Sequence, residues 1–143
     1  MQEEKEKIKY TEKEWWCLVK IQFLGATNTV TGSKTLLTMP NGLKILVDCG
    51  LYQSSNIEEM IRINGNDFDF DVTNIDVCLI SHGHLDHIGG LGLLIKKGFH
   101  GKIISTDPVG HFASINLKDC ARIMKDDTFR ANKTRPKNKL TPL

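Results

Sequence analysis

The chain has 143 residues, of which 40% are apolar and 25% are charged, and its formal net charge is +2. This length and composition allow one ordinary globular domain, and they exclude a disordered chain. A net charge so close to zero does not by itself indicate a nucleic-acid or membrane partner.

Charge is unevenly distributed along the chain. Residues 1–14 carry nine charges, so we expect no signal peptide there, and we expect residues 1–17 to form a charged leader. No apolar run approaches the roughly eighteen residues of a membrane span, so we expect no membrane partner. Residues 130–143 hold five basic and no acidic residues. This segment is either a solvated basic tail or truncation point, or a stretch that binds RNA phosphates.

The first part of the domain reads as a β-meander. Strands are expected at residues 18–24, 33–39 and 43–47, with a turn at Pro40-Asn41-Gly42 between the last two. Ser54 or Ser55 is expected to cap a helix that ends near Arg62. Residues 67–71 are expected to form a turn that buries two phenylalanines.

The second part alternates strands and helices. The apolar run 75–80 predicts a buried strand, and a short helix follows in which Leu91, Leu94 and Ile95 share one face. Residues 102–105 predict another strand, and Asp107-Pro108 predicts the start of a helix that continues to about residue 129. The domain is thus expected to span residues 18–129. Its cysteines form no CxxC pair, which favours a reduced, cytoplasmic protein without disulfides.

Three histidines and one aspartate gather directly after the buried strand. They are His82, His84, Asp86 and His87. Imidazole nitrogen and carboxylate oxygen are the ligands that a zinc-like cation prefers. His82 and His84 lie two residues apart and point the same way on extended backbone, whereas adjacent Asp86 and His87 diverge. This spacing predicts two ligand pairs for two neighbouring metal ions, and the alternative is a solvated histidine-rich loop.

Asp48 ends the third strand beside a glycine, and two roles are open to it. It either serves ordinary turn chemistry or accepts the distal N–H of a metal-bound imidazole. His100 and His111 lie outside the cluster, and we interpret both as surface histidines.

The run His82-Gly83-His84-Leu85-Asp86-His87 matches the HxHxDH signature of the metallo-β-lactamase superfamily. Four flanking stretches resemble the β-CASP nuclease branch of that superfamily, and they comprise residues 23–26, 30–33, 45–53 and 70–76. The resemblance extends from about Lys20 to Lys125.

The resemblance implies an α/β (α+β) fold, namely the N-terminal half of an αββα sandwich with a mixed sheet and flanking helices. It implies that His82 and His84 hold one zinc, that Asp86 and His87 hold a second, and that Asp48 supports the site. Asp86 and Asp48 would be the catalytic carboxylates. The implied activity is hydrolysis of RNA phosphodiesters by a hydroxide that the two zinc ions activate.

The later motifs of this family, which supply further metal ligands, are not found in the sequence. Two protein ligands per zinc fall short of the three that catalytic zinc normally has. We therefore expect an N-terminal fragment that is inactive alone and that needs a missing C-terminal half or self-associates. Two alternatives stay open: a related hydrolase acting on a thioester, lactone or lactam, and a non-catalytic remnant with half a metal site.

Overall fold

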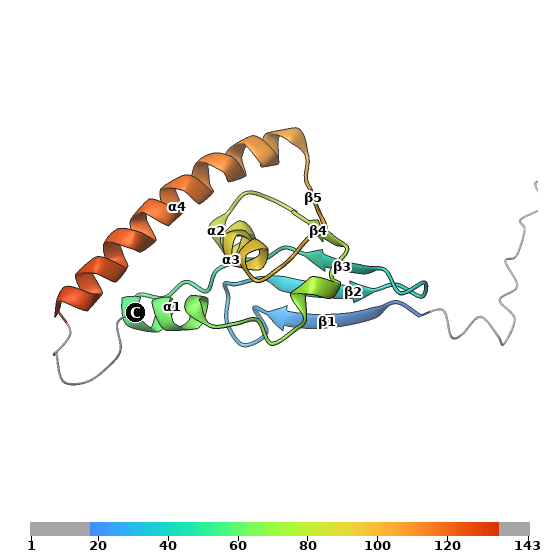
Figure 1. Ribbon diagram of the computed structural model, residues 1–143, viewed down its shortest axis with the longest axis horizontal. Coiled ribbons are helices and arrows are strands. Elements are labelled where there is room, and N and C mark those ends of the chain that lie inside the picture. The colour runs from blue at the N-terminus through green and yellow to red at the C-terminus, as the bar shows by residue number, and fades with distance from the viewer. Residues whose placement is uncertain (1–17, 135–143) are drawn as a thin grey trace, which may run out of the picture.

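The computed structural model describes residues 18–134, which form one five-stranded sheet and its helices (Figure 1). The strands are β1 (Lys20–Gly25), β2 (Lys34–Thr38), β3 (Lys44–Val47), β4 (Val77–Leu79) and β5 (Lys102–Ile104). The helices are α1 (Ile57–Gly65), the 3₁₀ helix η2 (Val72–Asn74), α2 (Leu85–Ile88), α3 (Leu91–Lys96) and α4 (Asp107–Thr134). The expected leader 1–17 lies outside the described residues, as does the tail from residue 135 onward.

The strands lie in the order β1-β2-β3-β4-β5. β1, β2 and β3 pair antiparallel, and β3, β4 and β5 pair parallel. Gly42 makes the β2–β3 turn possible with a φ of 87°, a backbone conformation that glycine adopts without steric cost. The predicted meander, the mixed sheet and the α+β class are therefore confirmed.

One face of the sheet forms the core. Leu36, Leu46 and Cys78 lie side by side across β2, β3 and β4, and all three are buried. Ile88 of α2 and Leu94 of α3 pack against them and are fully buried. The helices are thus held on this side by apolar contact, and Figure 1 shows α2 and α3 lying over it.

The opposite face of the sheet is apolar but is not buried. Because side chains alternate along a strand, this face carries every second residue of each strand. The apolar residues on it are Ile21, Phe23, Leu37, Ile45, Val47, Val77, Leu79 and Ile104. None is buried, and Ile21, Phe23 and Ile104 are 55%, 69% and 47% exposed. We call these eight residues the bare sheet face.

Three expected details differ from the structure. α1 is capped by Asn56, whose side chain accepts a hydrogen bond from the Glu59 N–H, and not by Ser54 or Ser55. Ile95 is 55% exposed, so it does not share the buried face of α3. α4 continues to Thr134, so the tail expected from residue 130 is helical in its first five residues.

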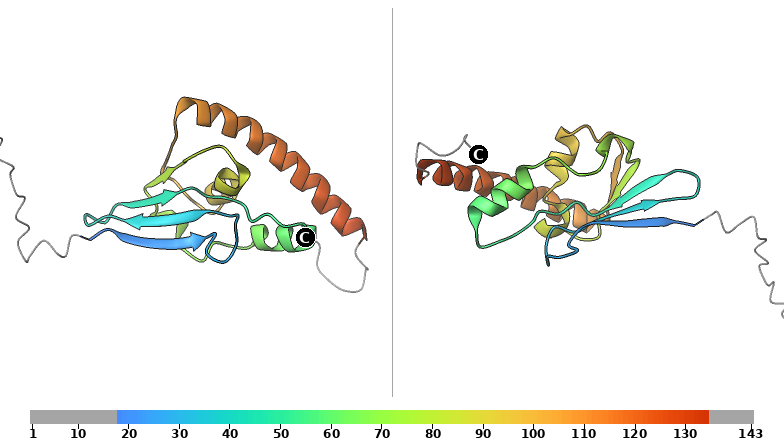
Figure 2. Two further views of the ribbon diagram at one scale, coloured as in Figure 1. Left: turned by 180° about the vertical axis from the view of Figure 1, so that it is seen from behind. Right: turned by 90° about the horizontal axis from the view of Figure 1, so that it is seen from below.

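Helix α4 leaves the end of β5 and passes over the segment that carries the histidines (Figures 1 and 2). The Asn116 amide donates to the carbonyl oxygen of Gly83 at 2.9 Å, which ties the helix to that segment. Within residues 18–134, no helix combines the length and apolar character that crossing a membrane requires.

Candidate metal centre

The candidate ligands lie at the edge where β3 and β4 end. Asp48 directly follows β3, and His82 and His84 lie in the connection between β4 and α2. Asp86 and His87 belong to α2, which His84 precedes on extended backbone. Because β3 and β4 are parallel, their carboxyl ends meet at one edge, and the four predicted ligands and Asp48 come together there.

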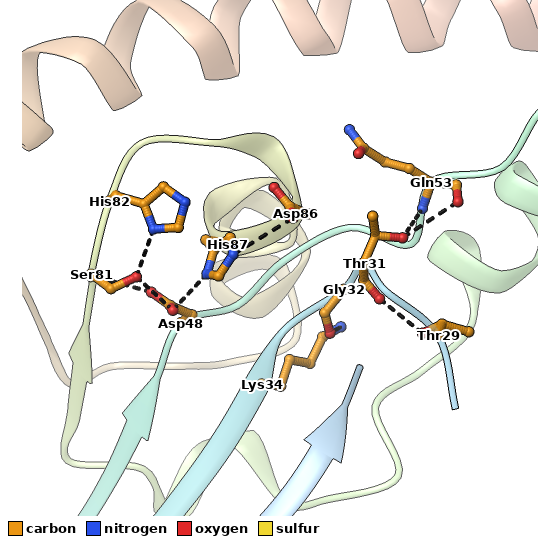
Figure 3. Close-up of polar contacts among 10 residues, drawn as sticks. All are labelled: Thr29, Thr31, Gly32, Lys34, Asp48, Gln53, Ser81, His82, Asp86 and His87. Carbon is orange, nitrogen blue, oxygen red and sulfur yellow. Dashed lines mark hydrogen bonds and ion pairs between the residues drawn. The ribbon is translucent and has the colours of Figure 1, made fainter. Parts of the chain in front are cut away.

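Asp48 is the hub of this arrangement (Figure 3). Its side chain is buried, and its carboxylate accepts three hydrogen bonds. Oδ1 accepts from the Ser81 backbone N–H at 2.8 Å, and Oδ2 contacts the Ser81 hydroxyl at 2.7 Å and His87 Nδ1 at 2.8 Å. The contact with His87 is the geometry expected of a carboxylate that orients an imidazole.

The three imidazoles lie close together. The ring centroids of His82 and His87 are 3.9 Å apart, and those of His82 and His84 are 4.7 Å apart. His87 Nε2 lies 3.6 Å from Asp86 Oδ2. Asp86 and His87 thus approach each other at their functional atoms, although adjacent positions were expected to diverge.

The backbone beside the cluster is fixed by close contact between two segments. Residues 48–51 run against residues 85–90, and the N–H groups of Cys49 and Leu51 donate to the carbonyls of His87 and Leu85 at 2.7 and 3.0 Å. The Ser33 N–H donates to the Asp86 carbonyl at 2.9 Å. Gly50 permits this approach, because a Cβ there would fall within 3.0 Å of the Asp86 and His87 backbone. The segment after β3 therefore positions α2 and the two ligands on it.

The donor set fits a zinc-like ion in its chemistry, because three imidazoles and a carboxylate lie in one cluster. Asp48 takes up Nδ1 of His87, so Nε2 is the nitrogen left for a metal. The side chains do not converge on one point as they stand. In the part of the chain that the structure describes, no group of three or more His, Cys, Asp or Glu side chains is arranged to hold a metal ion.

A cavity of about 530 Å³ lies on the core side of the sheet, between α1, α3 and the β1–β2 connection. Lys34 lines it, and burial lowers the pKa of the Lys34 amine. The amine donates to the Gly32 carbonyl at 3.3 Å and so holds the residue next to Ser33. Phe68 and Phe70 line the same cavity and are half-buried, with ring centroids 5.0 Å apart.

The thiols of Cys49, Cys78 and Cys120 are buried and free. Burial raises the pKa of Cys49 and of Cys78 to about 12.

His100 and His111 are exposed, as expected of surface histidines. Sequence reasoning missed the roles of Ser81 and Ser33. For Ser81 a signal was present, because a hydroxyl residue lies between the strand and the first histidine; Ser33 acts through its backbone N–H, which no side-chain pattern indicates.

A family model described as "Anti-Pycsar protein Apyc1" matches residues 19–105, more than half of the chain. The chain belongs to this family. The Apyc1 match covers the whole sheet, α1 to α3 and all four predicted ligands.

Curated relatives agree with the motif-based resemblance. Ribonuclease TTHA0252 of Thermus thermophilus is 35% identical over 78% of this chain, and transcription termination factor FttA of Methanosarcina mazei is 36% identical over 68%. Integrator complex subunit 11 of Danio rerio is 31% identical over 80%. The predicted membership of the metallo-β-lactamase superfamily, in its β-CASP nuclease branch, is confirmed. The Apyc1-family chain spans 25%, 15% and 19% of the lengths of these relatives.

Among solved structures, a HARLDQ-motif metallo-β-lactamase variant from Cronobacter sakazakii matches with a TM-score of 0.42 and 31% identity. The match covers 62% of this chain and 32% of the Cronobacter chain.

Proposed function

We propose that this chain carries the first ligands of a zinc-dependent hydrolase that cleaves RNA phosphodiesters. His82, His84, Asp86 and His87 are the proposed ligands, and Asp86 and Asp48 are the proposed catalytic carboxylates. The observation that carries the proposal is the cluster of these donors around the buried Asp48 carboxylate, which holds His87 by its Nδ1 atom at 2.8 Å.

Each residue has a distinct role in this proposal. Asp48 keeps the His87 ring in place by its Nδ1 atom and leaves Nε2 facing away from the Asp48 carboxylate. Asp86 would bind the metal and would orient the attacking water. Zinc, when bound, would supply a water of lowered pKa and would neutralise charge on the phosphate oxygens. Gly50 and Ser33 hold the backbone of α2 so that these side chains stay together.

The proposal requires donors beyond these four. Two zinc ions need about three protein ligands each, and the four residues supply only part of that set. The remaining ligands are therefore proposed to come from outside residues 18–134, either from the remainder of a longer protein or from another chain. The short coverage of the relatives supports this part of the proposal. The described residues alone are expected to be inactive.

RNA is the proposed substrate because one relative is named a ribonuclease and others act in transcription termination and in the Integrator complex. A related hydrolase with a thioester, lactone or lactam substrate would use the same four ligands, because the missing ligands and the substrate pocket set specificity.

The test uses the full-length protein that the gene encodes, loaded with zinc. Cleavage of a labelled RNA is measured for the wild type, His84→Ala, Asp86→Ala and the control variant His111→Ala. Zinc content is measured on the same samples by mass spectrometry. We expect His84→Ala and Asp86→Ala to lose both zinc and cleavage, and we expect His111→Ala to retain both because His111 is exposed on α4.

The other outcomes separate the alternatives. Hydrolysis of small esters without RNA cleavage would identify a related hydrolase. Zinc bound without hydrolysis of either substrate would identify a non-catalytic remnant. RNA cleavage retained by both ligand variants would contradict the proposal.

A further inference from the structure

Ser81 lies between the buried carboxylate and the first histidine of the cluster. Its hydroxyl oxygen is 2.7 Å from Asp48 Oδ2 and 2.9 Å from His82 Nδ1 (Figure 3). Its backbone N–H separately donates to Asp48 Oδ1 at 2.8 Å. The side chain of Ser81 therefore links Asp48 to His82.

The hydroxyl carries one proton, and this fixes the direction of both contacts. An ionised carboxylate can only accept, so the Ser81 hydroxyl donates its proton to Asp48 Oδ2. The hydroxyl oxygen is then the acceptor in the second contact, and His82 Nδ1 must carry the proton in it. The opposite assignment would leave the Ser81 and Asp48 oxygens facing each other at 2.7 Å with no proton between them.

The same assignment of protons to donor atoms applies to His87. Asp48 Oδ2 also contacts His87 Nδ1 at 2.8 Å, so this nitrogen carries a proton as well. Both neutral imidazoles then have their basic lone pair on Nε2. One buried carboxylate thus sets the proton position on two rings, directly for His87 and through a hydroxyl for His82.

We propose that Ser81 is a positioning residue: its hydroxyl donates to Asp48 and accepts from His82, and this relay of hydrogen bonds fixes His82 as the Nδ1–H tautomer, with Nε2 free to bind a metal. The relay is a property of the metal-free chain, and its consequence for metal binding rests on the proposed function. Ser81 acts through His82 and touches neither substrate nor metal.

The first test reads the tautomer in the metal-free chain. Nitrogen-15 imidazole signals are recorded over a pH series, and the tautomer is read on the basic side, where the signals no longer change with pH. We expect His82 to show the Nδ1–H pattern in the wild type and in Ser81→Thr, which keeps a hydroxyl. We expect Ser81→Ala to lose that pattern at His82 but to keep it at His87, because Asp48 still holds His87 directly.

A purely local structural role for Ser81 gives a different result. Ser81→Ala keeps the backbone N–H that donates to Asp48 Oδ1, so the end of β4 stays in place. If Ser81 served only to hold this end, then Ser81→Ala and Ser81→Thr would show the same His82 tautomer as the wild type. That result would overturn the relay.

The second test measures the zinc affinity of the full-length protein by competition with a chelating dye. Loss of a residue that orients a metal ligand typically weakens binding about 10- to 100-fold, and we expect Ser81→Ala to fall in this range. Ser81→Thr is expected to bind as the wild type does. Ser105→Ala is the matched control, because the Ser105 hydroxyl donates only to the neighbouring Thr106 carbonyl.

The two proposals can fail separately. If the full-length wild-type protein binds no zinc, the proposed function fails, and the tautomer measurement alone decides the role of Ser81. Unchanged zinc affinity in Ser81→Ala, together with an unchanged His82 tautomer, would overturn the inference while leaving the metal centre intact.

Discussion

Gly50 offers the sharpest test of the backbone that carries the ligands. A Cβ at this position would lie 2.8 Å from the His87 backbone nitrogen and still closer to the Asp86 carbonyl carbon and oxygen. These are backbone atoms, so no side chain can rotate away. Gly50→Ala therefore forces residues 48–51 and α2 apart.

The expected cost follows from the contacts that surround Gly50. Separation breaks the bonds from Cys49 to His87 and from Leu51 to Leu85, each contributing about 1 kcal/mol. Steric overpacking adds about 1–3 kcal/mol, and the reduced freedom of the unfolded chain returns about 0.5–1 kcal/mol. We expect Gly50→Ala to lower the free energy of unfolding by about 2–4 kcal/mol and to weaken zinc binding.

The assay is urea denaturation followed by far-ultraviolet circular dichroism at low protein concentration. Gly92→Ala is the matched control, because Gly92 lies in α3 with no atom within 4 Å of the added Cβ. This control should raise stability by up to about 1 kcal/mol through helix propensity. A Gly50→Ala chain as stable as the wild type would refute the close approach of the two segments.

Three further predictions concern the core, the thiols and the bare sheet face. Leu46→Ala should cost about 2–5 kcal/mol in the same denaturation assay, because Leu46 is fully buried; a loss below 1 kcal/mol would contradict the described core. Burial raises the pKa of Cys49 and Cys78, so their protonated thiols stabilise the fold fully below the ordinary thiol pKa of 9.0, and this stability is lost as the pH rises toward about 12. Iodoacetamide at neutral pH should therefore leave both thiols unmodified until the chain unfolds, as mass spectrometry can check. The bare sheet face should drive self-association, which sedimentation velocity measures across a concentration series. Phe23→Ser should reduce it and the equally exposed Phe129→Ser on α4 should not, whereas a monomeric wild type would contradict the reasoning.

Local patterns predicted most of the fold. The alternating run before Pro40 and the apolar run that ends at Ile80 each specify one strand, because burial of one or both faces fixes their side-chain pattern. The Asn41-Gly42 turn marks the boundary between β2 and β3. The end of α4 could not be predicted in this way. Residues 130–134 are mostly polar and basic, so they lack the apolar periodicity that distinguishes an amphipathic helix from a solvated tail.

The site was predicted in its residues but not in its arrangement. Spacing along the chain placed His82, His84, Asp86 and His87 in one neighbourhood, because all lie within six residues. The hub role of Asp48 depends on the parallel pairing of β3 and β4, which no local pattern contains. The role of Ser81 follows only from the count of protons around Asp48, which requires the distances themselves.

Asp48 carries a second constraint besides its charge, since its backbone φ of 61° lies in the left-handed region. Among residues with a side chain, asparagine and aspartate tolerate that region best. Asparagine would keep the turn but place an amide where an acceptor is needed, and glutamate would keep the charge but not the turn. Neither substitution keeps both features, because the same residue provides the bend of the chain and the hydrogen-bond acceptor for Ser81 and His87.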